Sequence, residues 1–283
     1  KKYTYAISKE LKVKGLINIQ FAVKDDIVYV LEVNPRASRT VPFVSKAIGV
    51  PLAKLAAKVM AGKKLGELGF TEEKKIAHVA VKESVLPFSR FSGVDIILGP
   101  EMKSTGEVMG IDNSFGVAFY KSQIAANQAL PSQGKIFISV KDDDKKDIVI
   151  IAKKLHEMGF EIIATKGTAK VLASKNITVT TVGKIEDGDE RILEFVRRGD
   201  IKLIINTPTG KRSYSDMKPM RNIAVMNGVP CITTIQGAQA AVSGIEAMRK
   251  KDISVKPIQE YIMESNSSEK CKKGKASCQS IFS

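Results

Sequence analysis

The sequence predicts an α/β protein in which a mixed α+β front piece precedes a doubly wound parallel sheet. Beyond Gly134, short β-branched runs alternate with longer segments of helical periodicity, a pattern typical of parallel strands covered by helices on both faces. Upstream of this point the periodicity is different. Between the two regions, the stretch Pro131-Ser132-Gln133-Gly134 is rich in turn residues and predicts a domain boundary.

The front piece is expected to begin with a β-hairpin and to continue mostly with helices. The predicted elements are hairpin strands at 16–23 and 27–33, a helical stretch at 41–61 with Pro51 at a first turn and Gly62 as a stop, a strand and turn at 76–88, and a helix at 115–130. The run from Gly99 to Gly110 has several glycines but no Gly-Lys-Ser/Thr, so we expect a structural turn and not a phosphate loop of the Walker type.

The second region alternates in a regular way from residue 135 to residue 250. The predicted strands are 135–140, 161–165, 177–182, 201–206 and 231–234, and the predicted helices are 145–158, 167–175, 190–198, 219–227 and 236–250. In such a sheet, ligands bind at the carboxyl ends of the strands. The loops that follow the strands are therefore where functional residues are expected.

Composition narrows the class of protein. At 283 residues, with 43% hydrophobic and 27% charged residues, the chain has the size and balance of a two-domain globular protein. It has no apolar run of about 20 residues and no signal peptide at its start, so no membrane is expected as a partner. Because Lys1 is no initiator Met, we expect the chain to begin inside a longer polypeptide. The formal charge of +15 is spread over many segments, which argues against nucleic acid as a partner.

The cysteines and histidines do not indicate a zinc site, a disulfide framework or a catalytic base. The three cysteines show neither a zinc spacing nor a disulfide framework, which fits a reducing, cytoplasmic location. His78 and His156 stand in apolar periodic surroundings, where a structural role is expected and not a catalytic one.

One candidate site lies at the end of the second hairpin strand. Glu32 interrupts an apolar run and Asn34 stands two residues later, so both side chains share one face. Carboxylate and carboxamide oxygens are ligands that suit Mg²⁺. Pro35 turns the chain, and Arg36 and Arg39 follow in a short loop where they could face phosphate oxygens. A surface strand with a solvated Glu–Arg ion pair is the alternative.

A second candidate site lies in the loops that follow three predicted strands, at 142–145, 165–169 and 206–212. Thr165-Lys166-Gly167-Thr168 opens a helix, where unpaired N–H groups, a close backbone approach at glycine and two hydroxyl groups suit an anion. A threonine that caps the helix with no ligand is the alternative. The convergence of three such loops at one edge favours an anion site.

These stretches resemble a known family. The segment from Ile27 to Arg39, with Gly15–Val23 before it and Thr40–Lys46 after it, resembles the end of an ATP-grasp domain, and more narrowly the second ATP-grasp half of the carbamoyl-phosphate synthetase large subunit. The resemblance continues to about Ile262. The region after Gly134 resembles that subunit's methylglyoxal-synthase-like allosteric domain. The resemblance implies a partial ATP-grasp domain at 1–131, the allosteric domain at 134–265 and a disordered tail at 266–283.

The resemblance implies roles for the hairpin residues. Gln20, Glu32 and Asn34 would be the ligands of Mg²⁺ (or Mn²⁺), with Gln20 and Glu32 also at the ATP site. Arg36 would contact phosphate or the carbamate–carbamoyl phosphate group, and Arg39 would support it, as the two catalytic residues. A strand glutamine such as Gln20 more often just faces solvent. The family's other nucleotide-binding parts lie upstream of Lys1, so the fragment is not expected to turn over alone.

The resemblance also implies effectors and partners. Lys145, Thr165, Thr168 and Lys184 would hold the phosphate of a nucleotide effector, UMP, and Asn206, Thr207 and Thr209 would line the rest of its pocket; Glu83 lies where ornithine contacts the family's proteins. A solvated carboxylate is the alternative for Glu83. The implied partners are a glutamine-hydrolysing small subunit and the upstream remainder of the large subunit, in pyrimidine and arginine biosynthesis. A homo-oligomer stays open.

Two other functions remain as alternatives. A stand-alone nucleotide- or phosphate-binding module would use only the second site. A methylglyoxal synthase would need carboxylates in the phosphate crevice, one of them after the fourth strand of the sheet. There this sequence has Asn206-Thr207-Pro208, and Asp200 stands at the opposite end of that strand. The lyase is therefore disfavoured.

Overall fold

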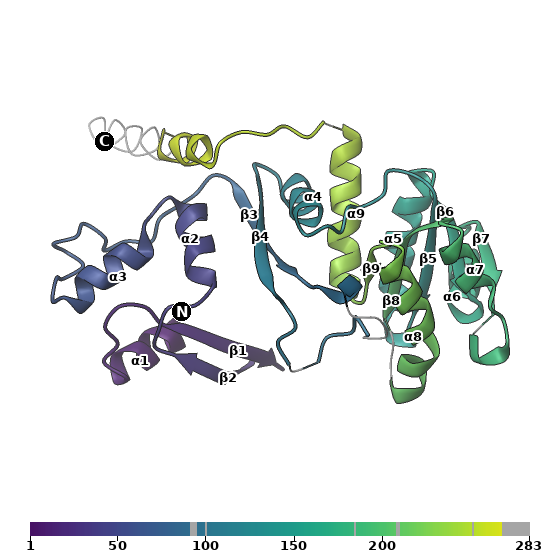
Figure 1. Cartoon of the computed structure of the whole chain (residues 1–283), viewed down its shortest axis with the longest axis horizontal. Helices are drawn as coiled ribbons and strands as arrows, with labels where there is room; N and C mark the ends of the chain where they lie inside the picture. Colours follow the sequence, from purple (N-terminus) through teal and green to yellow (C-terminus); the bar gives the residue numbers. More distant parts are fainter. Residues whose placement is uncertain (91–94, 100, 184, 208–209, 251, 268–283) are drawn as a thin grey trace, which may run out of the picture. The chain divides into compact units, whose positions relative to one another are not determined.

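The computed structural model describes residues 1–90, 95–99, 101–183, 185–207, 210–250 and 252–267. By their contacts these residues form two compact units. The first unit holds residues 1–78 and the stretch from residue 256 onward, and the second holds residues 79–255 (Figure 1). The boundary expected at 131–134 lies inside the second unit. The division into an ATP-grasp part and an allosteric part follows the family resemblance and stays a prediction.

The first unit is built around an antiparallel hairpin. Its elements are α1 (Lys2–Glu10), β1 (Asn18–Lys24), β2 (Ile27–Asn34), α2 (Thr40–Ile48), α3 (Leu52–Met60) and a helix at 258–267. The expected hairpin is confirmed, since β1 pairs with β2 around a turn in which Asp25 and Asp26 have φ angles of 51° and 60°. Two consecutive positive φ angles match the right-handed twist of the flanking strands.

Two helices occupy the stretch expected to be helical at 41–61, and the second begins just after Pro51, as expected. Gly49 ends α2 with a left-handed φ of 68°, and Pro51 stands just before α3. A left-handed glycine closes a helix, and a proline has no N–H to continue one. A Cβ on Gly49 would lie 2.7 Å from Cγ2 of Ile262, so the 258–267 helix packs against this break.

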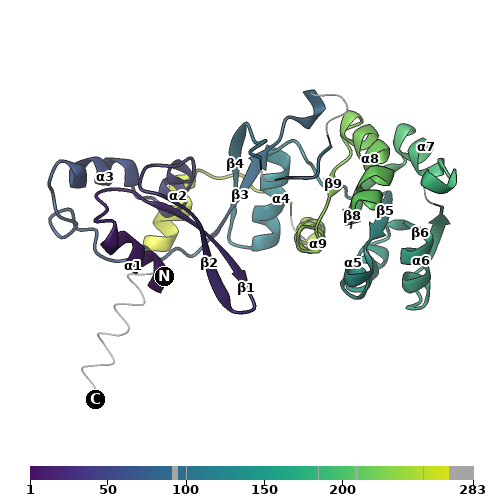
Figure 2. The same ribbon diagram turned by 90° about the horizontal axis from the view of Figure 1, so that it is seen from below.

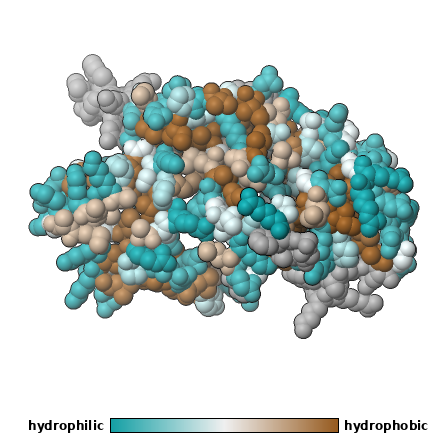
Figure 3. Space-filling view, in the orientation of Figure 1, coloured by the Kyte–Doolittle hydropathy of each residue, from teal (hydrophilic) through white to brown (hydrophobic). Residues whose placement is uncertain are grey.

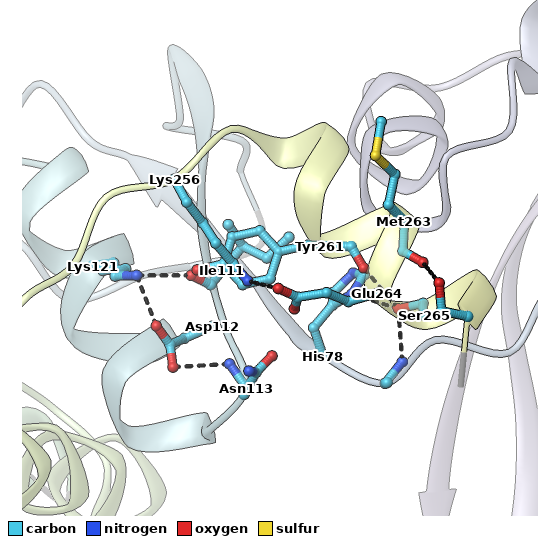
Figure 4. Close-up of polar contacts among 12 residues, drawn as sticks. His78, Ile111, Asp112, Asn113, Lys121, Lys256, Tyr261, Met263, Glu264 and Ser265 are labelled. Carbon is cyan, nitrogen blue, oxygen red and sulfur yellow. Dashed lines mark hydrogen bonds and ion pairs between the residues drawn. The ribbon is translucent and has the colours of Figure 1, made fainter. Parts of the chain in front are cut away.

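His78 joins the 258–267 helix to the rest of the first unit. Its Nδ1 lies 3.1 Å from Oγ of Ser265 and its Nε2 lies 2.8 Å from the carbonyl oxygen of Ala47, and the ring is buried (Figure 4). The Tyr261 ring meets it edge-on, with centroids 5.7 Å apart. Both ring nitrogens are therefore engaged in holding elements together, as the expected structural role requires.

The disordered tail expected at 266–283 was predicted to start too early in the chain. Residues 266 and 267 still belong to the 258–267 helix, and Asn266 Oδ1 accepts a hydrogen bond from Lys74 Nζ at 2.6 Å. Tyr261 and Ile262 anchor the helix upstream of this point, whereas Ser265 and Asn266 at its end are small and polar, which is why composition alone predicted a disordered stretch there. The remainder of the expected tail, 268–283, lies outside the described residues.

The second unit opens with an antiparallel pair, β3 (Val79–Val85) and β4 (Gly106–Asp112), packed against α4 (Phe115–Ala125). The run from Gly99 to Gly110 was expected to form a structural turn. That prediction is wrong from Gly106 onward, where the chain is strand. A Cβ on Gly110 would lie 1.9 Å from the carbonyl oxygen of Ala118. This glycine marks a close approach of strand and helix, a use of glycine that sequence alone does not separate from a turn.

The helix α4 also packs against α9 (Ile235–Lys250), the last helix of the second unit. A Cβ on Gly116 would lie 2.5 Å from the carbonyl oxygen of Ser243, so the two backbones nearly touch. This close packing explains why residues 79–130 belong to the same compact unit as the parallel sheet.

The parallel sheet has five strands in the order β7-β6-β5-β8-β9. The strands are β5 (Lys135–Val140), β6 (Glu161–Thr165), β7 (Val179–Val182), β8 (Ile201–Thr207) and β9 (Cys231–Ile232), and the helices between them are α5 (Lys145–Glu157), α6 (Lys166–Ala173), α7 (Arg191–Arg197) and α8 (Gly210–Met226). The expected alternation of strands and helices is confirmed.

Helices cover both faces of this sheet. Ile136 and Ile138 lie in a core with buried residues of α5, α6 and α9, whereas Phe137 lies in a second core with residues of α7 and α8. Figure 2 shows α7 and α8 on one side of the strands and α5 and α6 on the other. Successive side chains of a strand point to opposite faces, which is why these strands read as continuous apolar runs.

The helix α8 begins nine residues before the predicted start at Pro219, which lies inside it. A proline normally interrupts a helix because it lacks an N–H donor and crowds the preceding turn. Here Met217, Met220 and Ala224 are buried in the core with α7, so tertiary packing overrides the local preference. Within the part of the chain that the structure describes, every helix is too short or too polar to span a bilayer.

Candidate functional site

At the hairpin, strand register brings the expected metal ligands to one face. Gln20 pairs directly with Glu32, and Asn18 pairs with Asn34 two positions away, so all four side chains lie on the same side of the hairpin. Asn34 Nδ2 donates to Glu32 Oε1 at 2.5 Å. Gln20 and Glu32 are exposed and Asn34 is half-buried. The alternation argument for Glu32 and Asn34 is thereby confirmed as geometry.

The donor set of this face fits a hard divalent cation. One carboxylate and two carboxamide groups offer oxygen ligands, the type that Mg²⁺ and Mn²⁺ prefer, and phosphate oxygens of a nucleotide would complete the shell. The Asn34 amide would have to turn to present Oδ1 beside Glu32, because its Nδ2 faces the carboxylate. Gln20, Glu32 and Asn34 are thus able to hold a metal ion, with a reorientation of one side chain.

The two arginines follow the hairpin in the loop that leads to α2. The backbone N–H of Arg36 donates to the carbonyl oxygen of Asn34 at 2.8 Å, which fixes the turn after the strand, and its Nη1 donates to the carbonyl oxygen of Ala37 at 3.0 Å. Arg39 stands immediately before α2, and both arginine side chains are exposed.

At the parallel sheet, the register brings three strand ends to one edge. Ser139 of β5 is level with Asn206 of β8, and Ile138 is level with Ala164 of β6, so the next residue of β6, Thr165, ends that strand beside Ser139. The strand β5 lies between β6 and β8. The loops expected to converge therefore do so, at the carboxyl end of three adjacent parallel strands.

The two threonines of this edge are buried and tied to β5. Thr165 Oγ1 donates to Ser139 Oγ at 3.2 Å and lies 3.5 Å from Thr168 Oγ1, which accepts a hydrogen bond from the Val140 N–H at 3.3 Å. Their exposed fractions are 8% and 1%. Thr165 occupies the N-cap position of α6 but its side chain makes no cap hydrogen bond. The alternative of a simple capping threonine does not describe it.

Lys145 brings a positive charge to the start of α6. A Cβ on Gly167 would lie 3.2 Å from Lys145 Nζ, so the ammonium group sits directly over the first turn of that helix. Lys145 also forms an ion pair with the exposed Asp142 at 2.5 Å. That pairing lowers the pKa of the Asp142 carboxyl, mainly through the hydrogen bond to Lys145. The ammonium and the helix N-terminus together form a positive region.

The end of β8 completes the edge. Thr207 Oγ1 accepts a hydrogen bond from the Lys141 N–H at 3.2 Å, and Asn206 Nδ2 donates to the carbonyl oxygen of Ser139 at 3.1 Å. Asn206 and Thr207 are 1% and 5% exposed. Two expected residues of this pocket, Lys184 and Thr209, lie outside the described residues. The described part of the expected pocket is thus Lys145, Thr165, Thr168, Asn206 and Thr207.

Glu83 lies apart from both groups, on β3. Its Oε2 accepts a hydrogen bond from Gln123 Nε2 of α4 at 2.7 Å, and the side chain is half-buried. Burial raises the pKa of this carboxyl, and the hydrogen bond from Gln123 opposes the rise without cancelling it. The fully solvated alternative is therefore wrong, and a role of Glu83 in binding an amino acid stays a prediction.

Sequence reasoning missed two residues that support the sheet edge. Arg221 of α8 has no exposed surface, and its Nη1 donates to Asn206 Oδ1 at 3.1 Å while its Nε donates to Asp95 Oδ1 at 2.7 Å. Asp95 is 126 positions away in the chain. The available signal was the spacing of Arg221, four residues after Met217 and three before Ala224, which puts a charge on a buried helix face.

Two family models match this chain. The model described as "Carbamoyl-phosphate synthase L chain, ATP binding domain" matches residues 1–68, which include the hairpin face. The model described as "MGS-like domain" matches residues 147–233, which include the threonines of β6 and α6 and the end of β8. The fold and the sites therefore define a partial ATP-grasp domain followed by a methylglyoxal-synthase-like domain.

Curated relatives extend the likeness to most of the chain. The carbamoyl phosphate synthase large chains of Methanothermobacter thermautotrophicus and Archaeoglobus fulgidus are 55% and 56% identical over 92% and 93% of this chain. This chain spans 25% and 24% of their lengths. A protein of Methanocaldococcus jannaschii named "Carbamoyl phosphate synthase large chain, C-terminal section" is 54% identical over 91% of this chain, which spans 44% of it. The chain is homologous to the C-terminal section of carbamoyl phosphate synthase large chains.

Proposed function

We propose that the chain works as the C-terminal part of a carbamoyl phosphate synthase, a ligase that makes carbamoyl phosphate from bicarbonate, glutamine-derived ammonia and two ATP. In this proposal the second unit binds a nucleotide effector, UMP. The observation that carries the effector site is the gathering of Lys145, Thr165, Thr168, Asn206 and Thr207 at one strand edge. A phosphate suits this edge because an ammonium, hydroxyl groups and a helix N-terminus all stabilise negative charge.

In the same proposal, residues of the hairpin and of the loop after it take part in the ligase reaction. Gln20, Glu32 and Asn34 hold the metal ion, and Arg36 and Arg39 hold and orient the phosphate of the carbamate–carbamoyl phosphate group. A Mg²⁺ ion held there would supply positive charge that offsets the negative charge of the phosphate groups in phosphoryl transfer. The exposure of Gln20 and Glu32 supports a site that is completed by other parts of the protein.

Calorimetric titration of UMP tests the effector site. We expect saturable binding to the parent chain and an affinity roughly 10- to 100-fold lower in Thr168→Ala, since a hydrogen bond to a charged group contributes about 1.5–3 kcal/mol. Thr168→Ser keeps the hydroxyl and should restore binding. Ser174→Ala is the matched control, because this hydroxyl lies at the other end of α6 and bonds only its own helix, to the carbonyl oxygen of Val171 at 2.7 Å. Equal affinities in Thr168→Ala and the parent would remove the threonines from the site.

An ADP-release assay tests the ligase half. The purified chain with bicarbonate, ammonia and MgATP should release no ADP above background, and activity should need the upstream part of a large chain and, with glutamine as the nitrogen source, the small subunit. Turnover by the chain alone would show that the hairpin site is complete by itself and would overturn the proposed division of labour.

A methylglyoxal synthase activity is disfavoured by the same edge. Asn206 and Thr207 occupy the end of β8 where a carboxylate base would be needed, and both are buried, with Asn206 bonded to Ser139 of β5 and Thr207 to Lys141 just after it. Asp200 immediately precedes β8, at its amino end, and so lies at the opposite edge of the sheet. Methylglyoxal formation from dihydroxyacetone phosphate by the purified chain would reverse this preference.

A further inference from the structure

The side chain of Asn206 is held from both ends. Its Nδ2 donates to the carbonyl oxygen of Ser139 at 3.1 Å, and its Oδ1 accepts from Arg221 Nη1 at 3.1 Å. An amide in this position cannot turn over without losing both hydrogen bonds inside a buried site, which is costly. Arg221 and the Ser139 carbonyl group together fix which way the Asn206 amide faces, with Arg221 holding its oxygen.

The guanidinium group of Arg221 is itself fixed by a second partner. The edge of the guanidinium group formed by Nε and Nη2 faces Asp95. Nε donates to Oδ1 at 2.7 Å, and Nη2 donates to Oδ2. A fully buried positive charge is stable only when it is paired in this way. Burial raises the pKa of the Asp95 carboxyl, but the hydrogen bonds and charge of Arg221 outweigh it, and the pKa lies below its ordinary value.

Asp95 belongs to the connection between β3 and β4, far from the sheet in sequence. Its Oδ1 also accepts from the Ile97 N–H at 3.3 Å, and the short helix η1 (Phe88–Arg90) in the same connection contacts α8. Hydrogen bonds thus run from this connection through Arg221 to Asn206 and on to β5. The bidentate fork suits arginine and not lysine, because only the planar guanidinium reaches Asp95 and Asn206 together.

We propose that Arg221 is a positioning residue for the nucleoside part of the effector: it orients the Asn206 amide at the end of β8 and ties that orientation to Asp95. The inference rests on the proposed effector site and divides that site into a part that holds the phosphate group and a part that holds the nucleoside. The phosphate group is held at the start of α6 by Thr168, which bonds the Val140 N–H, and by Lys145, whose ammonium group lies over Gly167. The nucleoside side of the pocket depends on Asn206 and hence on Arg221.

Titrations of Arg221→Lys with two probes test this division. We expect the Kd for UMP, measured by calorimetry, to rise about tenfold, and the Kd for inorganic phosphate, measured by ³¹P NMR, to change less than about twofold. Arg198→Lys is the matched control, because Arg198 forms an exposed ion pair with Glu194 on the surface, 3.7 Å long, and should change neither value. A loss confined to UMP is a result that general loosening of the fold would not produce.

Other outcomes overturn the inference. Equal losses for UMP and phosphate would mean that Arg221 only supports the fold, and unchanged affinities would mean that it has no positioning role. If Arg221→Lys does not fold, Asp95→Asn releases the same fork from its other end, and an unchanged UMP affinity in that variant overturns the inference. Absence of UMP binding in the parent chain would instead be a failure of the proposed effector site, and it would take the inference with it.

Discussion

The hairpin face and the sheet edge both gather the residues expected of a phosphate-handling site, but they differ in how the chain supports them. At the hairpin, Gln20 and Glu32 are exposed and Glu32 is hydrogen-bonded to a neighbour on its own strand. At the sheet edge, Thr168 and Asn206 are 1% exposed and bonded to an adjacent strand. The first is a set of ligands on a surface, and the second is a set of side chains fixed before any ligand arrives.

The two sites also differ in how exposed the neighbouring apolar side chains are. The hairpin exposes large apolar side chains, with Val23 69% and Leu31 64% exposed, and Figure 3 shows hydrophobic surface over this part of the first unit. The strands under the sheet edge are among the most deeply buried parts of the chain, with Leu203 and Phe137 at 0%. A wide exposed apolar surface marks an interaction site. The hairpin thus presents apolar surface that a partner could cover, whereas the described side chains of the sheet edge are held by the unit's own strands.

The largest effect that sharpens this comparison concerns stability. Leu203→Ala should lower the free energy of unfolding of the second unit by about 3–5 kcal/mol, because it leaves a cavity in a core from which solvent is excluded. Leu31→Ala, the same change on the hairpin, should stay within about 0.5 kcal/mol. Urea denaturation of both variants measures the difference. Equal losses would show that Leu31 is covered in solution, against its exposure in the structure.

The next effect concerns activity. In a protein that contains the upstream ATP-grasp part, Glu32→Ala should lower the rate of carbamoyl phosphate synthesis about 100-fold or more, since it removes the sole carboxylate of the proposed metal site. Its unfolding midpoint in urea should not move. Glu73→Ala is the control, because Glu73 is another exposed carboxylate of the same unit and pairs with Lys1 at 2.7 Å. Full activity in Glu32→Ala would make the solvated-strand alternative correct.

A third prediction concerns how the 258–267 helix is anchored to the rest of the first unit. Ser265→Ala removes the hydroxyl that accepts from the Ala77 N–H at 3.1 Å and faces His78, so buried polar groups lose their partner at a cost of about 1–3 kcal/mol. Hydrogen exchange should accelerate around residues 47 and 77 and stay unchanged in the parallel sheet. Ser267→Ala, an exposed position of the same helix, is the control. Unchanged exchange would mean that the 258–267 helix contributes nothing to the unit.

The smallest effect is a pH dependence. Because burial raises the pKa of Glu83 above 4.5, the protonated carboxyl is favoured in the folded state, and the stability it contributes is lost as the pH rises through the folded pKa. Glu83→Gln should therefore be more stable than the parent at pH 7 by less than about 1 kcal/mol, since the group is partly screened by solvent. The difference should vanish at acid pH in urea titrations. A constant difference at all pH values would contradict the raised pKa.

Much of the sheet could be predicted from sequence because its strands are short apolar runs bounded by helical patterns. The ends of β5, β6 and β8 were predicted within one residue, and the alternation implied that their loops meet. The hairpin was equally visible, from two runs of strand-forming residues on either side of the turn Lys24-Asp25-Asp26. In both regions the signal is local, so each element could be found from its own residues.

What could not be predicted depends on contacts between distant residues. The Asp95–Arg221 pair joins positions that no local pattern relates, and Gly110 is a glycine because of a backbone contact with α4. The 258–267 helix is anchored through His78 and Gly49, which lie far from it in the sequence. The start of α8 was missed because its buried methionines outweigh the proline that usually ends a helix.

A single pair of titrations on the chain tests the contrast between the two sites most directly. Calorimetry with UMP and, separately, with Mg²⁺ and a non-hydrolysable ATP analogue compares a site that is fixed in advance with one that needs a partner. We predict saturable binding of UMP and no measurable binding of the magnesium–nucleotide complex at the hairpin. Tight binding of the magnesium–nucleotide complex with no heat from UMP would contradict the account, because the exposed site would then be the complete one.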